Sequence, residues 1–243
     1  MGTDGNDMTL LSICIAVADE VGIERPTSIV GNAQPTSQKL LRYANKTGTR
    51  LMKKVAWEVL RTEKTFTSVA TETQTGILPS DFDRFVTETF WDRTYATLMP
   101  GPISASEWQG LKAFNYAGEA KFAFRGGAVL VIPVPAAGRS YAFEYVRNTW
   151  CQSAALAAQT AFAADTDTGI LNEELLTLGT KFVYLTDEGL PNQLAAQEFK
   201  EYFDMMMDND QPASKVMIAG DIFGGRRHYT GTPISNTTNI NFI

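Results

Sequence analysis

Hydrophobic positions recur at intervals of three and four residues through several long stretches of the chain. This spacing places apolar side chains on one face of a helix. It predicts helices over residues 8–22, 37–62, 81–94, 106–114, 172–189 and 192–209. The longest of these follows Thr36, a residue type that caps helix N-termini, and its apolar stripe extends from Leu40 to Val59.

Residues 119–150 change from the helical pattern to an alternating one. Tight turns at 126–127 and 136–139 separate three runs of β-type residues, which predicts an antiparallel β-meander. A weaker alternation over residues 65–77 suits a strand or an extended loop. We therefore expect a mainly α protein, an antiparallel helix bundle formed by residues 1–118 and 151–210, with 119–150 as a small inserted meander.

The last part of the chain has a different composition. Residues 211–243 are rich in glycine, threonine, serine and asparagine, with scattered isoleucine, phenylalanine and tyrosine. Such a segment cannot bury a core of its own. We predict an extended C-terminal arm that contacts another protein chain, for example by adding a strand to the edge of its sheet.

The charge balance limits the classes of partner. The chain holds 21 lysines and arginines against 27 aspartates and glutamates, a formal net charge of −6. Proteins that wrap nucleic acid need clustered basic residues, so this composition disfavours that role. The longest apolar run, residues 128–135, is too short to span a bilayer. The first residues are acidic where a secretory leader is basic, so we expect a cytoplasmic product without membrane insertion.

One predicted helix departs from the acidic composition. The polar side of the 37–62 helix carries a run of basic residues: Lys39, Arg42, Lys46, Arg50, Lys53 and Lys54. A charged helix face is most often simply solvated. The functional alternative is a docking face for an acidic partner or for a neighbouring subunit.

Residues with reactive side chains are few. The one histidine, His228, excludes sites built from several histidines and disfavours triad chemistry. Cys14 and Cys151 are far apart in the sequence and cannot form a zinc knuckle by themselves. Cys14 lies in an apolar helical pattern, and we predict that it is a buried free thiol in a reducing compartment. Residues 165–169 begin like a calcium loop but fail at its fifth, sixth and twelfth positions, which favours a turn. We expect no cofactor and no metal.

Carboxylates are plentiful in the middle of the chain: Glu72, Asp81, Asp83, Glu88, Asp92 and Glu107. Two carboxylates at the correct separation can hydrolyse a glycan. The sequence does not place any two of them at that separation, and Asp81 and Asp83 suit the start of the predicted helix. A cell-wall glycan hydrolase therefore stays open as an alternative function.

Short segments between residues 8 and 205 follow one another in a characteristic order. They include TLLS at 9–12, ADEVG at 18–22, WEVL at 57–60, LPSDFDRF at 78–85, WDRT at 91–94, GPIS at 101–104, FEY at 143–145 and ADTDT at 164–168. The ordered series, and no single motif in it, resembles the head-to-tail adaptor proteins of short-tailed phages. The final arm lies outside the resemblance.

The resemblance implies a structural, non-enzymatic role. Such adaptors form a ring, expected to be dodecameric, that joins the portal vertex to the tail nozzle. Genomic DNA passes through the channel without specific binding. The implied partners are further copies of the chain, the portal protein, the nozzle protein and, as an additional candidate, the tail fibre. The implied location is the neck of the virion, after synthesis in the bacterial cytoplasm.

Under this resemblance two surfaces become candidate docking sites. The basic helix face would contact a neighbouring subunit. The arm would bind the portal through its apolar, aromatic and basic side chains: Ile222, Phe223, Arg226, Arg227, Tyr229, Ile234, Ile240 and Phe242. The alternatives are another connector layer, such as a head-completion or stopper protein, and a virion-associated peptidoglycan hydrolase that would use paired carboxylates.

Overall fold

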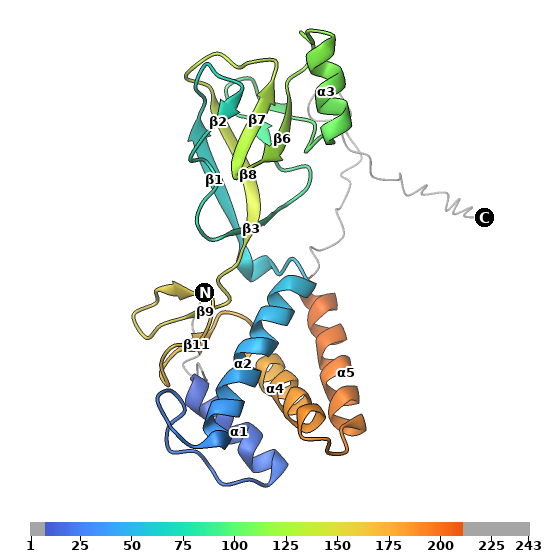
Figure 1. Cartoon of the computed structure of the whole chain (residues 1–243). Helices are drawn as coiled ribbons and strands as arrows, with labels where there is room; N and C mark the ends of the chain where they lie inside the picture. The colour runs from blue at the N-terminus through green and yellow to red at the C-terminus, as the bar shows by residue number, and fades with distance from the viewer. Residues whose placement is uncertain (1–7, 211–243) are drawn as a thin grey trace, which may run out of the picture. The chain divides into compact units, whose positions relative to one another are not determined.

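The computed structural model of the chain describes residues 8–210 (Figure 1). Of these residues, 38% are helical and 21% are in strands. The helices are α1 (Leu10–Val21), α2 (Pro35–Lys54), α3 (Ala105–Ala113), α4 (Glu173–Asp187), α5 (Gln193–Asp210) and the 3-10 turn Glu58–Leu60. The expected mainly α bundle is therefore wrong, because the described chain is a mixed α/β structure with five α-helices and three antiparallel sheets.

The strands are short, and eight of them precede residue 150. They are β1 (Arg61–Thr67), β2 (Thr73–Gln74), β3 (Phe82–Phe85), β4 (Trp91–Asp92), β5 (Thr97–Leu98), β6 (Lys121–Arg125), β7 (Ala128–Ile132), β8 (Ser140–Arg147), β9 (Cys151–Gln152), β10 (Ala158–Gln159) and β11 (Thr168–Gly169). The largest sheet has the order β1-β8-β4-β5, with β3 also paired to β8. The other sheets are β2-β7-β6 and β10-β9-β11.

Four helices form as the apolar spacing predicts. The Thr9 side chain accepts a hydrogen bond from the Ser12 amide at the start of α1, and Gly22 ends that helix with a φ of 74°. Asn172 caps α4 by accepting from the Leu175 amide at 3.0 Å. Helix α4 packs against α1, α2 and α5, which places their apolar stripes in one shared core.

The second helix is shorter than the predicted span of 37–62. It begins at Pro35 and ends at Lys54, after which Val55 is extended. Residues 61–67 instead form β1, which pairs with β8 from Arg61 opposite Val146 to Thr67 opposite Ser140. The threonine-rich residues 61–67 do not continue the helix, because their backbone hydrogen bonds are made by this long-range pairing.

The predicted helix over 81–94 is also wrong, because this segment forms β3 and β4. A register shift between Phe82 and Arg84 leaves Asp83 as an extra residue in β3. Such a bulge displaces the alternation by one position, so Phe82 and Phe85 face the same side although they are three residues apart. A spacing of three is also the helical signal, which explains why the sequence pattern misleads here.

The predicted meander over 119–150 forms only in part. Strands β6 and β7 pair as a hairpin around Gly126 and Gly127. Strand β8 does not follow β7 in the same sheet but pairs with β1, β3 and β4. Pro133 and Pro135 lie between β7 and β8, and proline has no amide hydrogen with which to continue the ladder. The sheets therefore combine strands from inside and outside residues 119–150.

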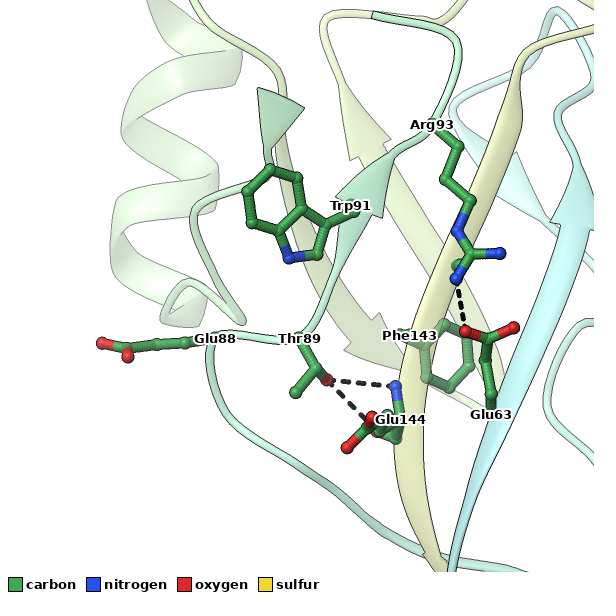
Figure 2. Close-up of a pocket in the computed structure, with 8 residues that line it drawn as sticks. Glu63, Glu88, Thr89, Trp91, Arg93, Phe143 and Glu144 are labelled. Atoms are coloured by element: carbon green, nitrogen blue, oxygen red, sulfur yellow. Dashed lines mark hydrogen bonds and ion pairs between the residues drawn. The ribbon is translucent and has the colours of Figure 1, made fainter. Parts of the chain in front are cut away.

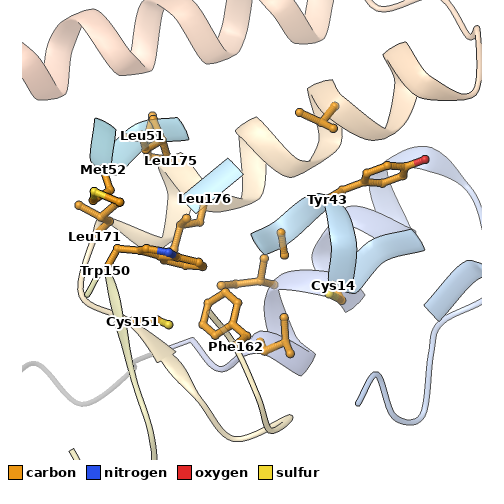
Figure 3. Packing of buried hydrophobic residues seen from close by; sticks show 14 of the residues in the cluster. Cys14, Tyr43, Leu51, Met52, Trp150, Cys151, Phe162, Leu171, Leu175 and Leu176 are labelled. Atoms are coloured by element: carbon orange, nitrogen blue, oxygen red, sulfur yellow. The ribbon is translucent and has the colours of Figure 1, made fainter. Parts of the chain in front are cut away.

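The described residues contain two large and separate hydrophobic cores. The first, here called the helical core, is formed by α1, α2, α4, α5 and the segment around Trp150 and Phe162 (Figure 3). The second, here called the aromatic core, lies among the strands and consists of Phe90, Met99, Phe122, Val129, Val131, Tyr141, Phe143 and Tyr145. A small satellite cluster places Trp108 of α3 against Leu130 and Ile132 of β7.

Cys14 is a buried free thiol, as predicted, and Cys151 is a buried free thiol as well. Burial raises the pKa of both to about 12, with smaller contributions from the charges of Asp165 and Asp167.

Among the helices of residues 8–210, none has the length and apolar content needed to cross a bilayer.

A glycine in the middle of α2 permits close packing in the helical core. A Cβ at Gly48 would lie 2.3 Å from a ring carbon of Trp150. Gly48→Ala is expected to destabilise the protein by about 1 kcal/mol, because the overpacking outweighs the gain in helix propensity. Gly110→Ala is the matched control, since Gly110 of α3 faces open space and alanine should stabilise that helix slightly. Urea denaturation of both variants measures the difference, and a stabilised Gly48→Ala variant would contradict the packing argument.

Candidate docking surfaces

The predicted basic residues form one continuous stripe along α2. Lys39, Arg42, Lys46, Arg50 and Lys53 follow one another at intervals of three or four residues, so their side chains share one side of the helix. The opposite side carries the buried residues of the helical core. At 1.5 Å per residue the stripe is about 20 Å long. We call these five residues the basic stripe, and Lys54 lies beside its end.

Two members of the stripe are paired within the chain. Lys39 Nζ lies 2.5 Å from Glu188 Oε1, and Arg42 lies 3.2 Å from Asp187 Oδ2. The Tyr43 hydroxyl donates to the same Asp187 oxygen. This hydrogen bond lowers the pKa of Asp187 below its ordinary value, with further contributions from the charges of Arg42, Lys46 and Lys39. The Lys54 ammonium instead lies 3.9 Å from the centre of the Phe203 ring.

The rest of the stripe forms no ion pair within the described residues 8–210. Lys46, Arg50 and Lys53 are exposed, and no carboxylate of residues 8–210 lies within ion-pair distance of them. Lys46 contributes only a longer-range charge interaction with Asp187. The middle and the C-terminal end of the stripe therefore present three positive charges to solvent in a chain whose net charge is negative.

A groove on the helical part of the chain has the opposite charge. It has a volume of about 600 Å³ and is lined by residues from α1, α4 and α5: Glu20, Glu174, Leu178, Lys181, Glu198, Glu201, Tyr202 and Met205. Four carboxylates against one lysine give a net of three negative charges. We call this feature the acidic groove. Its lining residues come from three helices that are separated in the sequence, so no local pattern predicted the groove as a whole.

Lys181 organises the acidic groove from within. Its ammonium lies 2.7 Å from Glu20 and 2.8 Å from Glu198, so it joins α1, α4 and α5. Burial lowers the pKa of Lys181, but the hydrogen bonds to Glu198 and Glu20 outweigh that effect and the pKa is raised overall. The other two carboxylates of the groove form no ion pair within residues 8–210. Glu201 accepts a hydrogen bond from the side-chain amide of Gln197 at 2.8 Å, so Glu174 and Glu201 both keep a negative charge that a cationic partner can pair with.

A smaller pocket lies on the largest sheet (Figure 2). It has a volume of about 180 Å³ and includes three glutamates, Glu63, Glu88 and Glu144, beside the partly exposed Trp91. Glu63 of β1 lies opposite Glu144 of β8, so the two side chains share one face of the sheet. Arg93 forms an ion pair with Glu63, whereas Glu88 points away from both other glutamates.

The carboxylates that the sequence analysis singled out do not converge on one site. Most of them have structural partners: Glu72 pairs with Lys112, Glu107 with Lys121 and Asp83 with Arg84, while Asp81 accepts from the Tyr145 hydroxyl and Asp92 accepts from the amides of residues 94 and 95. Asp81 directly precedes β3 and Asp83 lies within that strand, so neither stands at a helix start. Glu63 and Glu144 were missed because their proximity depends on the β1–β8 pairing.

The two aspartates of the 165–169 segment accept hydrogen bonds from backbone amides. Asp167 organises a local turn, as predicted, whereas Asp165 contacts a segment distant in the sequence. The Asp165 carboxylate accepts hydrogen bonds from the amides of Ile29 and Val30, the shorter at 2.7 Å. The Asp167 carboxylate accepts from Ala163 and Ala164 at 2.7 and 2.8 Å. Within the part of the chain that the structure describes, no group of three or more histidine, cysteine or carboxylate side chains could share a metal ion.

The other candidate residues lie outside the described residues. This holds for the arm over 211–243, for His228 and for the proposed portal-binding set: Ile222, Phe223, Arg226, Arg227, Tyr229, Ile234, Ile240 and Phe242. No protein-family model matches the chain, and a search of curated proteins finds no significant match. A function for this chain is therefore inferred from the surfaces of residues 8–210 and from the ordered segments of the sequence.

Proposed function

We propose that this chain is a structural adaptor of a short-tailed phage virion. Copies of it form a ring that joins the portal vertex to the tail nozzle, and the genomic DNA passes through the channel of that ring. The ordered segments between residues 8 and 205 support this assignment through their resemblance to head-to-tail adaptors.

The structural observation that carries the proposal is the presence of two separately packed cores in one short chain. The helical core is built from residues before 61 and after 145, whereas the aromatic core is built from residues between 66 and 145. Each core supports a surface of its own. Such an arrangement suits a subunit that must hold two different neighbours at once, because each binding surface can stay rigid independently of the other.

The two parts offer different chemistry to partners. The helical part carries the basic stripe and the acidic groove. The strand-rich part exposes large apolar side chains, among them Phe114, Tyr95 and Val134 at 86%, 61% and 54% exposure. Exposed aromatic residues are typical of protein contacts. In this proposal the strand-rich part contacts the nozzle or a fibre, and the arm over 211–243 contacts the portal.

The charge of the chain suits a DNA conduit. A net charge of −6 per subunit disfavours tight contact with phosphates, which would slow the passage of DNA. Three cations of the basic stripe have no ion-pair partner among residues 8–210, and they fit this proposal only if another protein surface covers them and they do not line the channel.

Truncation after Pro212 tests the portal contact. The truncated chain should remain folded, because both large cores consist of residues before this point, and it should no longer bind portal rings of the same phage. Circular dichroism measures folding, and co-sedimentation with electron microscopy measures binding. Phe114→Ala in the full-length chain is the surface control and should bind fully. Unchanged binding of the truncated chain would contradict the role of the arm.

The pocket beside Trp91 keeps a second function open. Glu63 and Glu144 are adjacent carboxylates on one sheet face, as a virion-associated peptidoglycan hydrolase would need. Zymography of the purified protein tests this alternative. A lytic band that is lost in Glu144→Gln would replace the adaptor proposal by the hydrolase or add an activity to it, whereas the adaptor alone should give no band.

A further inference from the structure

We propose that the basic stripe of one copy docks into the acidic groove of the next copy, and that this contact joins the subunits of the ring. The inference rests on the proposed adaptor function, and it adds the two surfaces that meet and the direction of assembly. The occupant of the groove is a second copy of this chain.

The charges of the two surfaces match. The stripe presents Lys46, Arg50 and Lys53 without ion-pair partners within residues 8–210. The groove has four carboxylates and one lysine, hence three unbalanced negative charges. Bringing the surfaces together would neutralise both, and complementary charge guides association and fixes the register of the contact.

The dimensions of the two surfaces also match. Lys46 and Lys53 are seven residues apart on α2, which is about 10 Å along the helix axis. The groove extends along α4 from Glu174 to Lys181 and along α5 from Glu198 to Met205, and the two residues of each pair are likewise seven positions apart. One exposed helix face therefore fits the length of the groove between α4 and α5.

The groove can also bury the apolar stems of the basic side chains. Leu178, Tyr202 and Met205 provide apolar surface between its carboxylates, and Met205 is 47% exposed. Lysine and arginine place their methylene groups on such surfaces while the charged end reaches a carboxylate. Methionine adapts its shape to a partner at low cost. The contact would thus gain hydrophobic burial in addition to its ion pairs.

The two surfaces lie on opposite sides of α4. Helix α2 contacts the side of α4 that carries Gly179 and Asp187, through Thr47 and Tyr43. The groove-lining residues Glu174, Leu178 and Lys181 lie roughly 180° away around the helix, at about 100° per residue. Two copies cannot satisfy both surfaces by pairing with each other. The contact is head-to-tail, which is the type of interface that closes into a ring.

Cross-linking tests which surfaces meet. A full-length chain with Arg50→Cys and Glu201→Cys, treated with a short bismaleimide at high protein concentration, should give a ladder of dimers, trimers and larger species. Cys14 and Cys151 are buried and have raised pKa values, so they should not react in the folded protein. The control pair Arg125→Cys and Glu201→Cys replaces the stripe position by an exposed arginine of β6 and should give no ladder.

Reversing the charges of the two surfaces tests the same contact without a cross-linking reagent. Lys46→Glu with Arg50→Glu should weaken self-association about 100-fold, and Glu174→Lys with Glu201→Lys should weaken it similarly, because like charges then face each other. An equal mixture of the two variants should restore association, since the reversed stripe fits the reversed groove. Lys64→Glu with Arg125→Glu changes the net charge equally outside both surfaces and should associate normally.

The outcomes separate this inference from the adaptor function. Ring assembly on the portal that is unaffected by either charge reversal would overturn the stripe–groove contact and leave the adaptor function standing. A mixture of variants that fails to restore association, although each variant keeps its circular dichroism and melting temperature, would overturn it as well. A wild-type chain that never associates with itself, alone or on portal rings, would overturn both proposals.

Discussion

Phe90→Ala is expected to lower the free energy of unfolding by about 4 kcal/mol, more than any other single change considered for this chain. Phe90 has no exposed surface. Its ring stacks on Phe122 at a centroid distance of 4.3 Å and on Phe143 at 5.5 Å, and it meets Phe66 edge to face at 6.0 Å. The variant would lose both the burial of the ring and these aromatic contacts.

The cavity left by Phe90→Ala should not collapse. The three neighbouring rings belong to β1, β6 and β8, which lie in two different sheets and are held by their own backbone pairing. The cost of a large-to-small substitution rises with the volume that stays empty. The strands would have to move relative to one another to fill it, which places the expected cost near the upper end of the usual range.

Urea denaturation measures this effect against a matched control. Phe114→Ala removes the same atoms from a side chain that is 86% exposed and should change stability by less than about 0.5 kcal/mol. The Cys14 thiol adds a second readout. Cys14 belongs to the helical core, so it should stay protected from thiol reagents under native conditions in Phe90→Ala. Equal losses in Phe90→Ala and Phe114→Ala would contradict the role of the aromatic core.

Most of the helices could be predicted from the sequence because the spacing of apolar residues within each segment indicates which face is buried. Helices α1, α4 and α5 each bury one apolar stripe in the helical core, and Asn172 marks the start of α4 as a capping residue. The strand-rich part could not be predicted in the same way. Strand β1 finds its partner β8 about 80 residues later, and several other strands are only two residues long.

The candidate docking surfaces could likewise be predicted only where their residues lie close together in the sequence. The basic stripe lies on a single helix, so its spacing alone revealed it. The acidic groove combines Glu20, Glu174 and Glu201 from three helices, and only the packing of α4 against α1 and α5 brings them together. One local signal was present: Glu198, Glu201 and Met205 recur at helical spacing along α5. The partners of Lys39 and Arg42 are almost 150 residues away along the chain and gave no local signal.

Arg84→Ala is expected to destabilise the protein by about 3 kcal/mol, because Arg84 of β3 caps the C-terminus of α2. Its guanidinium donates to the carbonyls of Lys53 at 2.8 Å, Met52 at 2.6 Å and Val55 at 2.6 Å. The last carbonyls of a helix have no partner within it, and a cation also interacts favourably with that end. With alanine at position 84, these three carbonyls would lose their hydrogen-bond donor. The Leu51 carbonyl would keep its own donor, the indole N–H of Trp57.

The choice of residue at position 84 separates geometry from charge. Arg84→Lys keeps the charge, but one ammonium cannot reproduce the planar fork that reaches three carbonyls, so about half of the loss should remain. Arg125→Ala is the control, since Arg125 of β6 is exposed and makes no ion pair within residues 8–210. Arg84 also links β3 to the end of α2, so limited proteolysis between residues 55 and 60 should quicken in Arg84→Ala. A lysine variant as stable and as protease-resistant as the wild type would show that the positive charge alone is sufficient, and that the three directed hydrogen bonds contribute little.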